Sequence, residues 1–215
     1  MRLRNIAGAR EVIAESPFVV HEEETQRGKW KQLFGNDAPL YVEIGMGKGQ
    51  FLMEQARRNP HINFVGIEKY SSVLLRALQK QEEELLPNIK FIRMDAERIA
   101  EVFAPGEVQH LFLNFSDPWP KERNAKRRLM SHQFLGRYEH ILADSALVEF
   151  KTDNRSLFSF ALEELAAMKW EVSAVTYDLH HDPQLSQNNV MTEYEERFSM
   201  RGNTICMLRA CPPGV

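Results

Sequence analysis

Five acidic side chains stand at or beside the ends of apolar runs in this 215-residue chain. They are Glu43, Glu68, Asp95, Asp117 and Asp153. Ionised carboxylates only accept hydrogen bonds, so a group of them suits a ligand that is rich in N–H, O–H or ammonium groups. The same group would repel the pyrophosphate of a dinucleotide. The acidic positions therefore favour a ligand without phosphate.

A glycine-rich stretch, EIGMGKGQF, follows the first apolar run and places Gly45, Gly47 and Gly49 in one loop. Glycines let the backbone turn sharply and approach a ligand closely, with amides of the following helix directed at it. The stretch is not a Walker loop, because Lys48 is followed by glycine, and in the dinucleotide fingerprint the third glycine comes one residue later. A plain tight turn explains this loop equally well when it is taken alone.

The acidic positions suggest what the loop would bind. Glu68 ends the second run, where a carboxylate can accept hydrogen bonds from both hydroxyls of a ribose. Asp95 is placed to accept from the exocyclic amine of an adenine, and Glu43 to face an amino group. An adenosine that carries an ammonium and no phosphate is S-adenosylmethionine, which we expect as the cofactor. Solvated loop carboxylates are the alternative for each residue considered singly.

The stretch NFSDPWPKERNAKRR, residues 114–128, joins a carboxylate, two prolines and a tryptophan to five basic residues. Pro118 and Pro120 restrict the turn, so Asp117 and Trp119 should be held at fixed angles. A planar indole there can stack on a base that has left its own stack. The basic residues can hold a phosphate backbone, although a solvated helix face also explains a basic run. The net charge of −3 excludes only a protein that binds nucleic acid over its whole surface.

The elements that position these residues are short β-rich runs alternating with helical patterns. The runs cover residues 40–45, 62–68, 89–96, 108–115 and 146–153. Most are almost continuously apolar, as expected for parallel strands covered on both faces. This order predicts a doubly wound α/β sheet with right-handed crossovers, in which ligands bind at the carboxyl ends of the strands. The five acids should therefore share one crevice.

Helices are predicted between the strands. Residues 71–86 begin at a serine pair suited to an N-cap, and residues 155–168 carry an apolar stripe. Helical spacing also relates a third group, namely Phe134, Leu135, Tyr138, Ile141 and Leu142. Residues 170–179 and 204–210 read as two further strands, which we expect to form an antiparallel pair at the sheet edge. We expect residues 1–36, with Arg2, Arg4 and Arg10, to be an N-terminal extension and residues 37–215 a single domain.

Composition narrows the class of protein. A hydrophobic content of 43% with 27% charged residues is ordinary for a globular chain, and no apolar run is long enough to cross a bilayer. Cys206 and Cys211 lie five apart in one apolar segment, so a strand would direct them to opposite faces, away from a shared disulfide or metal. We expect a cytoplasmic protein without a membrane or metal partner, as a monomer or weak homodimer.

The E-x-G-x-G-x-G loop, the strand-end acids and NFSDPWPK together closely resemble the bacterial tRNA (guanine-N7)-methyltransferases. The resemblance runs from GKWKQLFGN (28–36) to MTEYEERF (191–198), and its most specific parts are LNFSDPWPK-R--KRR, FKTDN and TEYE. It implies the Rossmann-like fold of class I S-adenosylmethionine-dependent methyltransferases, with seven mostly parallel strands and an antiparallel edge strand. It also implies tRNA as the substrate and 7-methylguanosine at position 46, in the variable loop, as the product.

The resemblance further implies a role for each matching position. The implied cofactor residues are Glu43, Gly45, Gly47, Glu68, Asp95 and Asp117, the last also at the catalytic centre. The implied substrate residues are Lys121, Asp153, Thr192, Glu193, Tyr194 and Glu195. The residues implied to touch RNA are Arg123, Asn124, Ala125, Lys126, Arg127 and Arg128. A capping box of Thr192 with Glu195 and an apolar pair of Tyr194 with Phe198 explain TEYEERF without RNA.

The chemistry asked of Asp117 is modest, because guanine N7 carries an in-plane lone pair and no proton must leave before methylation. Alignment and a fixed anion facing the developing purine cation would suffice. An amino-group methyltransferase acting on adenine or cytosine is the main alternative, but its Asn/Asp-Pro-Pro-aromatic motif differs here, since Trp119 follows the first proline directly. An RNA-binding module with a non-catalytic cofactor pocket is a second alternative. A nicotinamide dehydrogenase is disfavoured by the glycine spacing.

Overall fold

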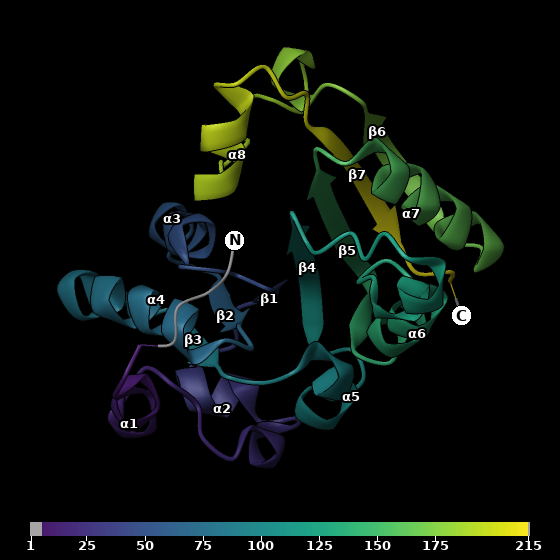
Figure 1. The fold of residues 1–215 in the computed structure, drawn as a ribbon. Helices are drawn as coiled ribbons and strands as arrows, with labels where there is room; N and C mark the ends of the chain where they lie inside the picture. Colours follow the sequence, from purple (N-terminus) through teal and green to yellow (C-terminus); the bar gives the residue numbers. More distant parts are fainter. Residues whose placement is uncertain (1–5, 215) are drawn as a thin grey trace.

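Seven strands form one sheet in the order β3-β2-β1-β4-β5-β7-β6 (Figure 1). The computed structural model describes residues 6–214. The strands are β1 (Leu40–Ile44), β2 (Asn63–Ile67), β3 (Ile89–Ile92), β4 (Val108–Asn114), β5 (Leu142–Thr152), β6 (Glu171–Thr176) and β7 (Cys206–Cys211). The first five pair in parallel, whereas β7 pairs antiparallel with both β5 and β6. The predicted mostly parallel sheet with antiparallel pairing at one edge is thus confirmed.

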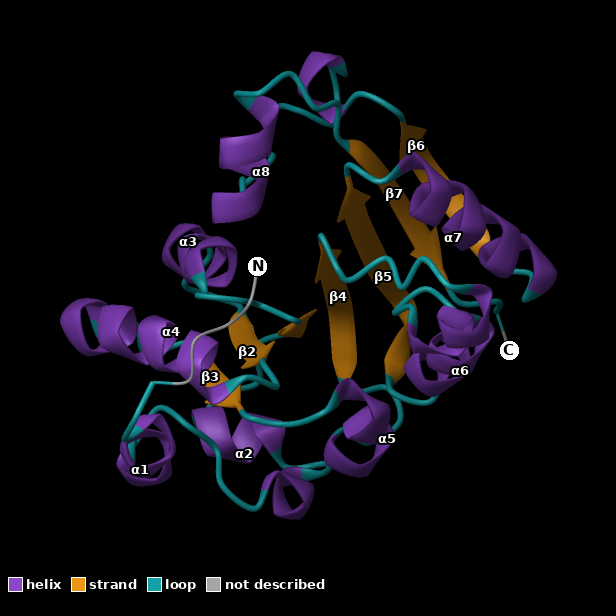
Figure 2. Cartoon of the chain, viewed as in Figure 1, coloured by secondary structure: helices purple, strands orange, loops and turns teal. Residues whose placement is uncertain are grey.

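Helices cover both faces of this sheet (Figures 1 and 2). The α-helices are α1 (Ala9–Glu15), α2 (Trp30–Phe34), α3 (Gln50–Arg58), α4 (Ser71–Glu84), α5 (Ile99–Val102), α6 (His132–Glu139), α7 (Arg155–Ala167) and α8 (Glu193–Ser199). The 3-10 turns are η1 (Glu23–Gln26), η2 (Ala96–Arg98), η3 (Glu122–Arg127) and η4 (Leu179–His181). Residues of α1, α3 and α4 pack on one face and those of α5, α6 and α7 on the other, as a doubly wound sheet requires.

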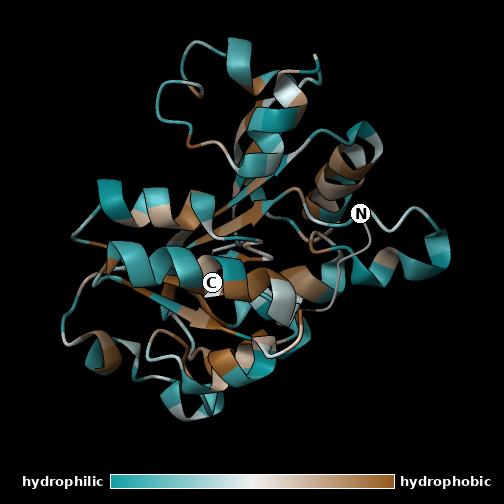
Figure 3. Ribbon diagram, turned by 60° about the vertical axis from the view of Figure 1, so that its left-hand side comes forward, coloured by the Kyte–Doolittle hydropathy of each residue, from teal (hydrophilic) through white to brown (hydrophobic). Residues whose placement is uncertain are grey.

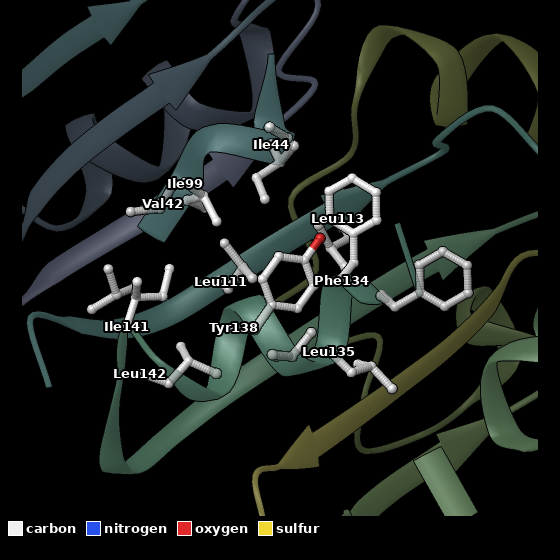
Figure 4. Packing of buried hydrophobic residues seen from close by; sticks show 14 of the residues in the cluster. Val42, Ile44, Ile99, Leu111, Leu113, Phe134, Leu135, Tyr138, Ile141 and Leu142 are labelled. Carbon is white, nitrogen blue, oxygen red and sulfur yellow. The ribbon is translucent and has the colours of Figure 1, made fainter. Parts of the chain in front are cut away.

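The core explains why the strands read as apolar runs. All five residues of β2 are buried, because helices cover both of its faces. On the second face, Phe134, Leu135 and Tyr138 of α6 pack against Leu111 and Leu113 of β4 (Figure 4). Hydrophobic residues lie on the inward sides of the helices and hydrophilic residues on the outer sides (Figure 3). This burial fixes the strands whose ends carry the acidic residues.

Some predicted boundaries differ from the structure. Helix α6 ends at Glu139 and β5 begins at Leu142, so the helical spacing of Ile141 and Leu142 was misleading. Both residues are buried all the same, which is why they fit a helical stripe. The serine pair at the start of α4 does not cap it. Tyr70 is the N-cap without a side-chain bond, and Ser72 Oγ instead accepts a hydrogen bond from the backbone N–H of Ile6 at 3.1 Å.

The first 36 residues pack against the rest of the chain where they are described. Val19 forms a parallel bridge with Phe91 of β3, and α1 packs on α4. Trp30 is 1% exposed and donates from its indole N–H to the carbonyl of Val102 at 3.1 Å. Arg2 and Arg4 lie outside the described residues, and the predicted domain division after residue 36 stays a prediction. Arg10 is exposed on α1.

Three further findings concern membranes, metals and cysteines. No helix between residues 6 and 214 is long and apolar enough to cross a membrane. Over the same range, no group of three or more histidine, cysteine or acidic side chains is placed to hold a metal ion. Cys206 and Cys211 are both free thiols, consistent with their five-residue spacing on β7.

Candidate cofactor and acceptor site

The glycine loop lies between the ends of β1 and β2. Gly45, Gly47 and Gly49 all have positive φ, at 73°, 60° and 78°, so the backbone path needs glycine. The backbone N–H of Gly47 donates to Glu68 Oε2 at 3.1 Å, and that of Tyr70 donates to Glu68 Oε1 at 2.9 Å. Burial raises the pKa of Glu68, and these two backbone bonds offset part of the rise. Glu68 therefore ties the loop to the end of β2.

Asp95 lies just beyond β3, where its carboxylate caps η2 by accepting from the backbone N–H of Glu97 at 3.1 Å. Lys69 forms an ion pair with the same carboxylate. Burial raises the pKa of Asp95, but the bond from Lys69, the Glu97 N–H and the nearby charge of Arg127 outweigh it and hold the pKa below its ordinary value. This carboxylate is ionised and already shares two positive neighbours.

Glu43 occupies a different position from the other acids. Its side chain is 1% exposed, and Oε1 accepts from the Asn114 side-chain amide at 2.8 Å while Oε2 has no partner among the described residues. Burial raises its pKa from an ordinary 4.5 to about 7, although Asn114 and the charge of Lys151 act in the opposite direction. Glu43 is thus buried within β1 and bonded to the last residue of β4.

The strand-end residues line a first cavity of about 280 Å³. Its walls include Gly45, Glu68, Asp95, Asp117 and Trp119. Three of the five acids predicted to share one crevice, namely Glu68, Asp95 and Asp117, border this space, whereas Glu43 and Asp153 do not. Added side chains at Gly45 and Gly47 would meet no atom within 4 Å, so the loop leaves open space on its outer side.

Asp117 sits in a strained turn that leaves β4. Phe115 and Trp119, on either side of it, have positive φ of 52° and 42° although neither is glycine. Such backbone conformations cost on the order of 1 kcal/mol each and gather at functional sites. The turn is held from the protein interior by Arg128, whose guanidinium donates to the carbonyls of Pro118 at 3.1 Å and Trp119 at 3.2 Å. Asp117 itself is exposed.

A second cavity of about 300 Å³ adjoins the first. Phe115, Ser116 and Asp117 border both cavities, while Asp153 and Tyr194 border only the second. The Tyr194 hydroxyl donates to Asp153 Oδ2 at 3.3 Å, and its ring lies 4.8 Å from that of Phe115. Asp117 therefore stands at the wall between two spaces, one lined by strand-end acids and one closed by α8.

The four residues TEYE have four different surroundings. Thr192 Oγ1 caps α8 by accepting from the backbone N–H of Glu195 at 2.9 Å. Glu193 pairs with Lys48 of the glycine loop at 3.0 Å and with Lys80 of α4 at 2.8 Å. Tyr194 faces the second cavity. Glu193 thus joins α8 to the glycine loop and to α4, and Tyr194 places α8 at the wall of the second cavity.

Glu195 is fully buried and does not face either cavity. Its Oε2 lies 2.7 Å from Lys151 Nζ at the end of β5, and Oε1 accepts from Asn189 at 2.6 Å and lies 2.9 Å from His180 Nε2. Burial raises its pKa, but Lys151 and these bonds outweigh burial and lower the pKa overall. The predicted capping box is therefore half right: Thr192 caps the helix, and the Glu195 carboxylate binds Lys151.

The basic residues after Asp117 do not act as one surface. Arg128 is directed inward, 9% exposed, with its guanidinium 4.3 Å from the ring of Phe160. Arg127 lies over the indole of Trp119, 3.8 Å from the ring centroid, and lines the first cavity. The other basic side chains of this stretch point to solvent, namely Lys121, Arg123 and Lys126. Asn124 and Ala125, within η3, are half-buried.

Comparison with known proteins places the chain in a family. Residues 37–208 match the family described as "Putative methyltransferase". A tRNA (guanine-N(7)-)-methyltransferase of Lachnoclostridium phytofermentans is 56% identical over 210 residues, which cover 98% of each chain. The chain belongs to the tRNA (guanine-N7)-methyltransferase family. A second relative in this family, from Geobacillus kaustophilus, is 47% identical over 99% of this chain and 98% of its own.

Solved structures show the same fold at low sequence identity. The 16S rRNA methyltransferase KamB superposes with a TM-score of 0.65 at 16% identity, over 86% of this chain and 94% of its own. A 16S rRNA (adenine(1408)-N(1))-methyltransferase with the cosubstrate SAM superposes with a TM-score of 0.56 at 17% identity, over 86% and 90% of the two chains. The doubly wound sheet predicted from the alternation of strands and helices, and the Rossmann-like fold implied by the resemblance, are those of these methyltransferases.

Two residues around the site of this protein were not predicted from the sequence. Lys151 stands in FKTDN, where an apolar strand ends, and gave no separate signal because a lysine at a strand end is ordinarily solvated. Asn203 donates to Asp153 Oδ2 at 2.8 Å from the loop before β7, a segment without a recognisable pattern. Both contacts depend on tertiary pairing of distant segments, which only the structure shows.

Proposed function

We propose that this protein transfers the methyl group of S-adenosylmethionine to N7 of a guanosine in tRNA, giving 7-methylguanosine. Membership of the tRNA (guanine-N7)-methyltransferase family supports the reaction, and the resemblance of its motifs supports position 46 of the variable loop as the target. The observation that carries the proposal is the placement of Asp117 on the wall between the two cavities. A cofactor in one and a base in the other would meet there.

The first cavity suits the cofactor by its chemistry. Ionised Asp95 can accept from an adenine amine, Glu68 has lone pairs left for a ribose diol beside its two backbone bonds, and open space lies outside the glycine loop. The walls carry three carboxylates, Glu68, Asp95 and Asp117, which would repel a pyrophosphate. S-adenosylmethionine supplies an electrophilic sulfonium methyl when it is bound. Gly45 and Gly47 would admit it close to the backbone, with Glu68 and Asp95 fixing the adenosine.

The second cavity suits the acceptor base. Asp153 is positioned by Tyr194 and Asn203, so one carboxylate is held at the far wall by two neutral donors. Asp117 and Asp153 together can accept hydrogen bonds from the N1–H and 2-amino group of guanine, whereas adenine has an acceptor at N1 and no 2-amino group. Lys121 is exposed at the start of the basic stretch and follows Asp117 closely in the sequence. We assign it to a phosphate of the tRNA or to O6 of the guanine.

Asp117 has two proposed tasks in the reaction. Its carboxylate helps align the base, and its negative charge faces the purine as positive charge develops on the imidazole ring. The fixed turn between Phe115 and Trp119 lets this anion act without reorganisation at the moment of transfer. No group in the site has to remove a proton, which agrees with the absence of a histidine from the walls of either cavity within the described residues.

The test is direct. Bulk tRNA lacking 7-methylguanosine is incubated with the protein and S-adenosylmethionine, digested to nucleosides and analysed by mass spectrometry. We expect one methyl group per accepted tRNA, as 7-methylguanosine within the variable loop. Methylated adenosine or cytidine would favour the amino-group alternative, and no incorporation would favour an RNA-binding module. Since tRNA is the proposed substrate, we also propose that the protein acts in the cytoplasm.

A further inference from the structure

Trp119 and Arg127 form a stacked pair on one wall of the first cavity. The Cζ of Arg127 lies 3.8 Å from the centroid of the Trp119 ring, the separation of two π-systems in van der Waals contact. Both residues line the space bordered by Glu68 and Asp95. Neither residue lines the second cavity. The pair therefore belongs to the side of the site where the adenosine is expected.

The backbone holds this pair in place from behind. Arg128 binds the carbonyls of Pro118 and Trp119, and Trp119 keeps a positive φ of 42°. Adjacent arginines thus have opposite tasks: Arg128 anchors the turn from the protein interior, and Arg127 covers the exposed face of the indole.

Charge also connects Arg127 to the adenine end of the cavity. Its guanidinium is close enough to Asp95 and Lys69 to affect both of their ionisation equilibria. Arg123 and Lys126, which share η3 with Arg127, point to solvent and line neither cavity. Arg127 is also exposed, but among the basic residues of η3 it alone lines the first cavity, whereas Arg123 and Lys126 are free to meet phosphates.

We propose that Arg127 and Trp119 form the outer wall of the cofactor pocket and pack against the adenine of S-adenosylmethionine, so that Arg127 is a cofactor-binding residue. This inference rests on the proposed function, since it concerns the cofactor of that reaction. A planar guanidinium stacks on an aromatic face and is weakly hydrated, which makes it suitable for a heterocycle. A contact of this kind changes affinity by roughly 3- to 30-fold.

The test measures cofactor affinity without tRNA. S-adenosylhomocysteine is titrated calorimetrically into the wild-type protein, Arg127→Ala and the matched control Lys126→Ala, at low and high salt. Arg127→Ala should weaken binding by roughly 3- to 30-fold at both salt concentrations, because stacking is little screened. Lys126→Ala removes the same charge from the same turn and should remain within twofold of the wild type. Equal affinities of the two variants would overturn the inference.

Tryptophan fluorescence provides a second readout at the proposed contact. Of the three tryptophans, Trp30 and Trp170 are buried at 1% and 5% exposure, away from the cavity, so a change on binding should arise from Trp119. S-adenosylhomocysteine should change the emission of the wild type, and this change should vanish in Trp119→Phe. A change that persists in that variant would contradict the stacking. If the wild type did not bind S-adenosylhomocysteine at all, the assignment of S-adenosylmethionine as the cofactor, and with it the proposed function, would be wrong.

Discussion

Replacing Glu195 by alanine should destabilise the protein, because it leaves the ammonium of Lys151 buried without a counter-charge. Both side chains are fully buried and their charged atoms lie 2.7 Å apart. Removing one partner of such a pair costs about 3–5 kcal/mol. Lys151 would keep two neutral acceptors, Asn189 Oδ1 at 3.1 Å and the Val190 carbonyl at 2.9 Å. These bonds satisfy the hydrogen-bonding capacity of the ammonium but do not neutralise its charge. The expected loss of folding free energy therefore lies near the lower end of this range, at about 3 kcal/mol.

Thermal and urea unfolding at neutral pH measure this loss. For a chain of this size, 1 kcal/mol corresponds to roughly 2–4 °C in Tm, so Glu195→Ala should lower Tm by about 6–12 °C. Glu196→Ala is the matched control, since that neighbour is exposed on the same helix. Combining Glu195→Leu with Lys151→Met removes both charges, and this double variant should lose less stability than Glu195→Ala alone.

The same substitution should lower methyl transfer at temperatures where the variant is folded. Glu195 holds α8 on the end of β5, and the preceding residue on that helix, Tyr194, closes the second cavity. Release of α8 would loosen the acceptor wall rather than the adenosine side, so S-adenosylhomocysteine affinity should change less than turnover. A Tm shift equal to that of Glu196→Ala would show that Lys151 is hydrated in solution, and the reasoning would fail.

Three other perturbations test separate parts of the site. Below pH 4.5 Glu43 is protonated in both the folded and the unfolded protein, and the stability that its raised pKa provides there is lost as the pH rises through about 7. This loss amounts to about 3 kcal/mol. Glu43→Gln should abolish the loss, so the variant should have a Tm above that of the wild type at pH 8 and an equal Tm at pH 4. Asp117→Asn should slow single-turnover methyl transfer roughly 100-fold with cofactor affinity preserved, and a rate within a few-fold of wild type would make Asp117 merely structural. Replacing Arg123 and Lys126 by alanine should make the plot of log K against log salt for tRNA shallower by roughly 1.5–2 units, and an unchanged slope would remove both from the RNA contact.

The alternation of strands and helices and part of the acidic crevice could be predicted from sequence because both follow from short-range patterns. Continuous apolar runs identify parallel strands, and a residue that follows such a run must lie at the strand's carboxyl end. This logic placed Glu68, Asp95 and Asp117 around one cavity. It failed for Asp153, which borders only the second cavity, and for Glu43, which is buried within β1, because alternation along a strand decides which face a side chain takes.

Charge patterns were less informative than apolar patterns. A run of basic residues looks uniform in sequence, but in the structure Arg128 is buried, Arg127 stacks on an indole, and Lys126 is solvated. The irregular backbone between residues 115 and 128 produces these differences, since its positive-φ residues and 3-10 turn follow neither helical nor strand periodicity. Side-chain direction in such a segment depends on tertiary contacts, here the carbonyls of Pro118 and Trp119.

Helix α8 shows the same limit most clearly and explains why it matters for function. Thr192 caps the helix, Glu193 pairs with the glycine loop, Tyr194 faces the second cavity and Glu195 is buried on Lys151. Four consecutive residues therefore connect the loop that borders one cavity to the wall that closes the other. A one-residue shift of α8 would break the ion pair at the base and misplace the ring at the wall together. One short helix thus contacts both the cofactor loop and the acceptor wall, and the buried Glu195–Lys151 pair anchors the acceptor side of that helix.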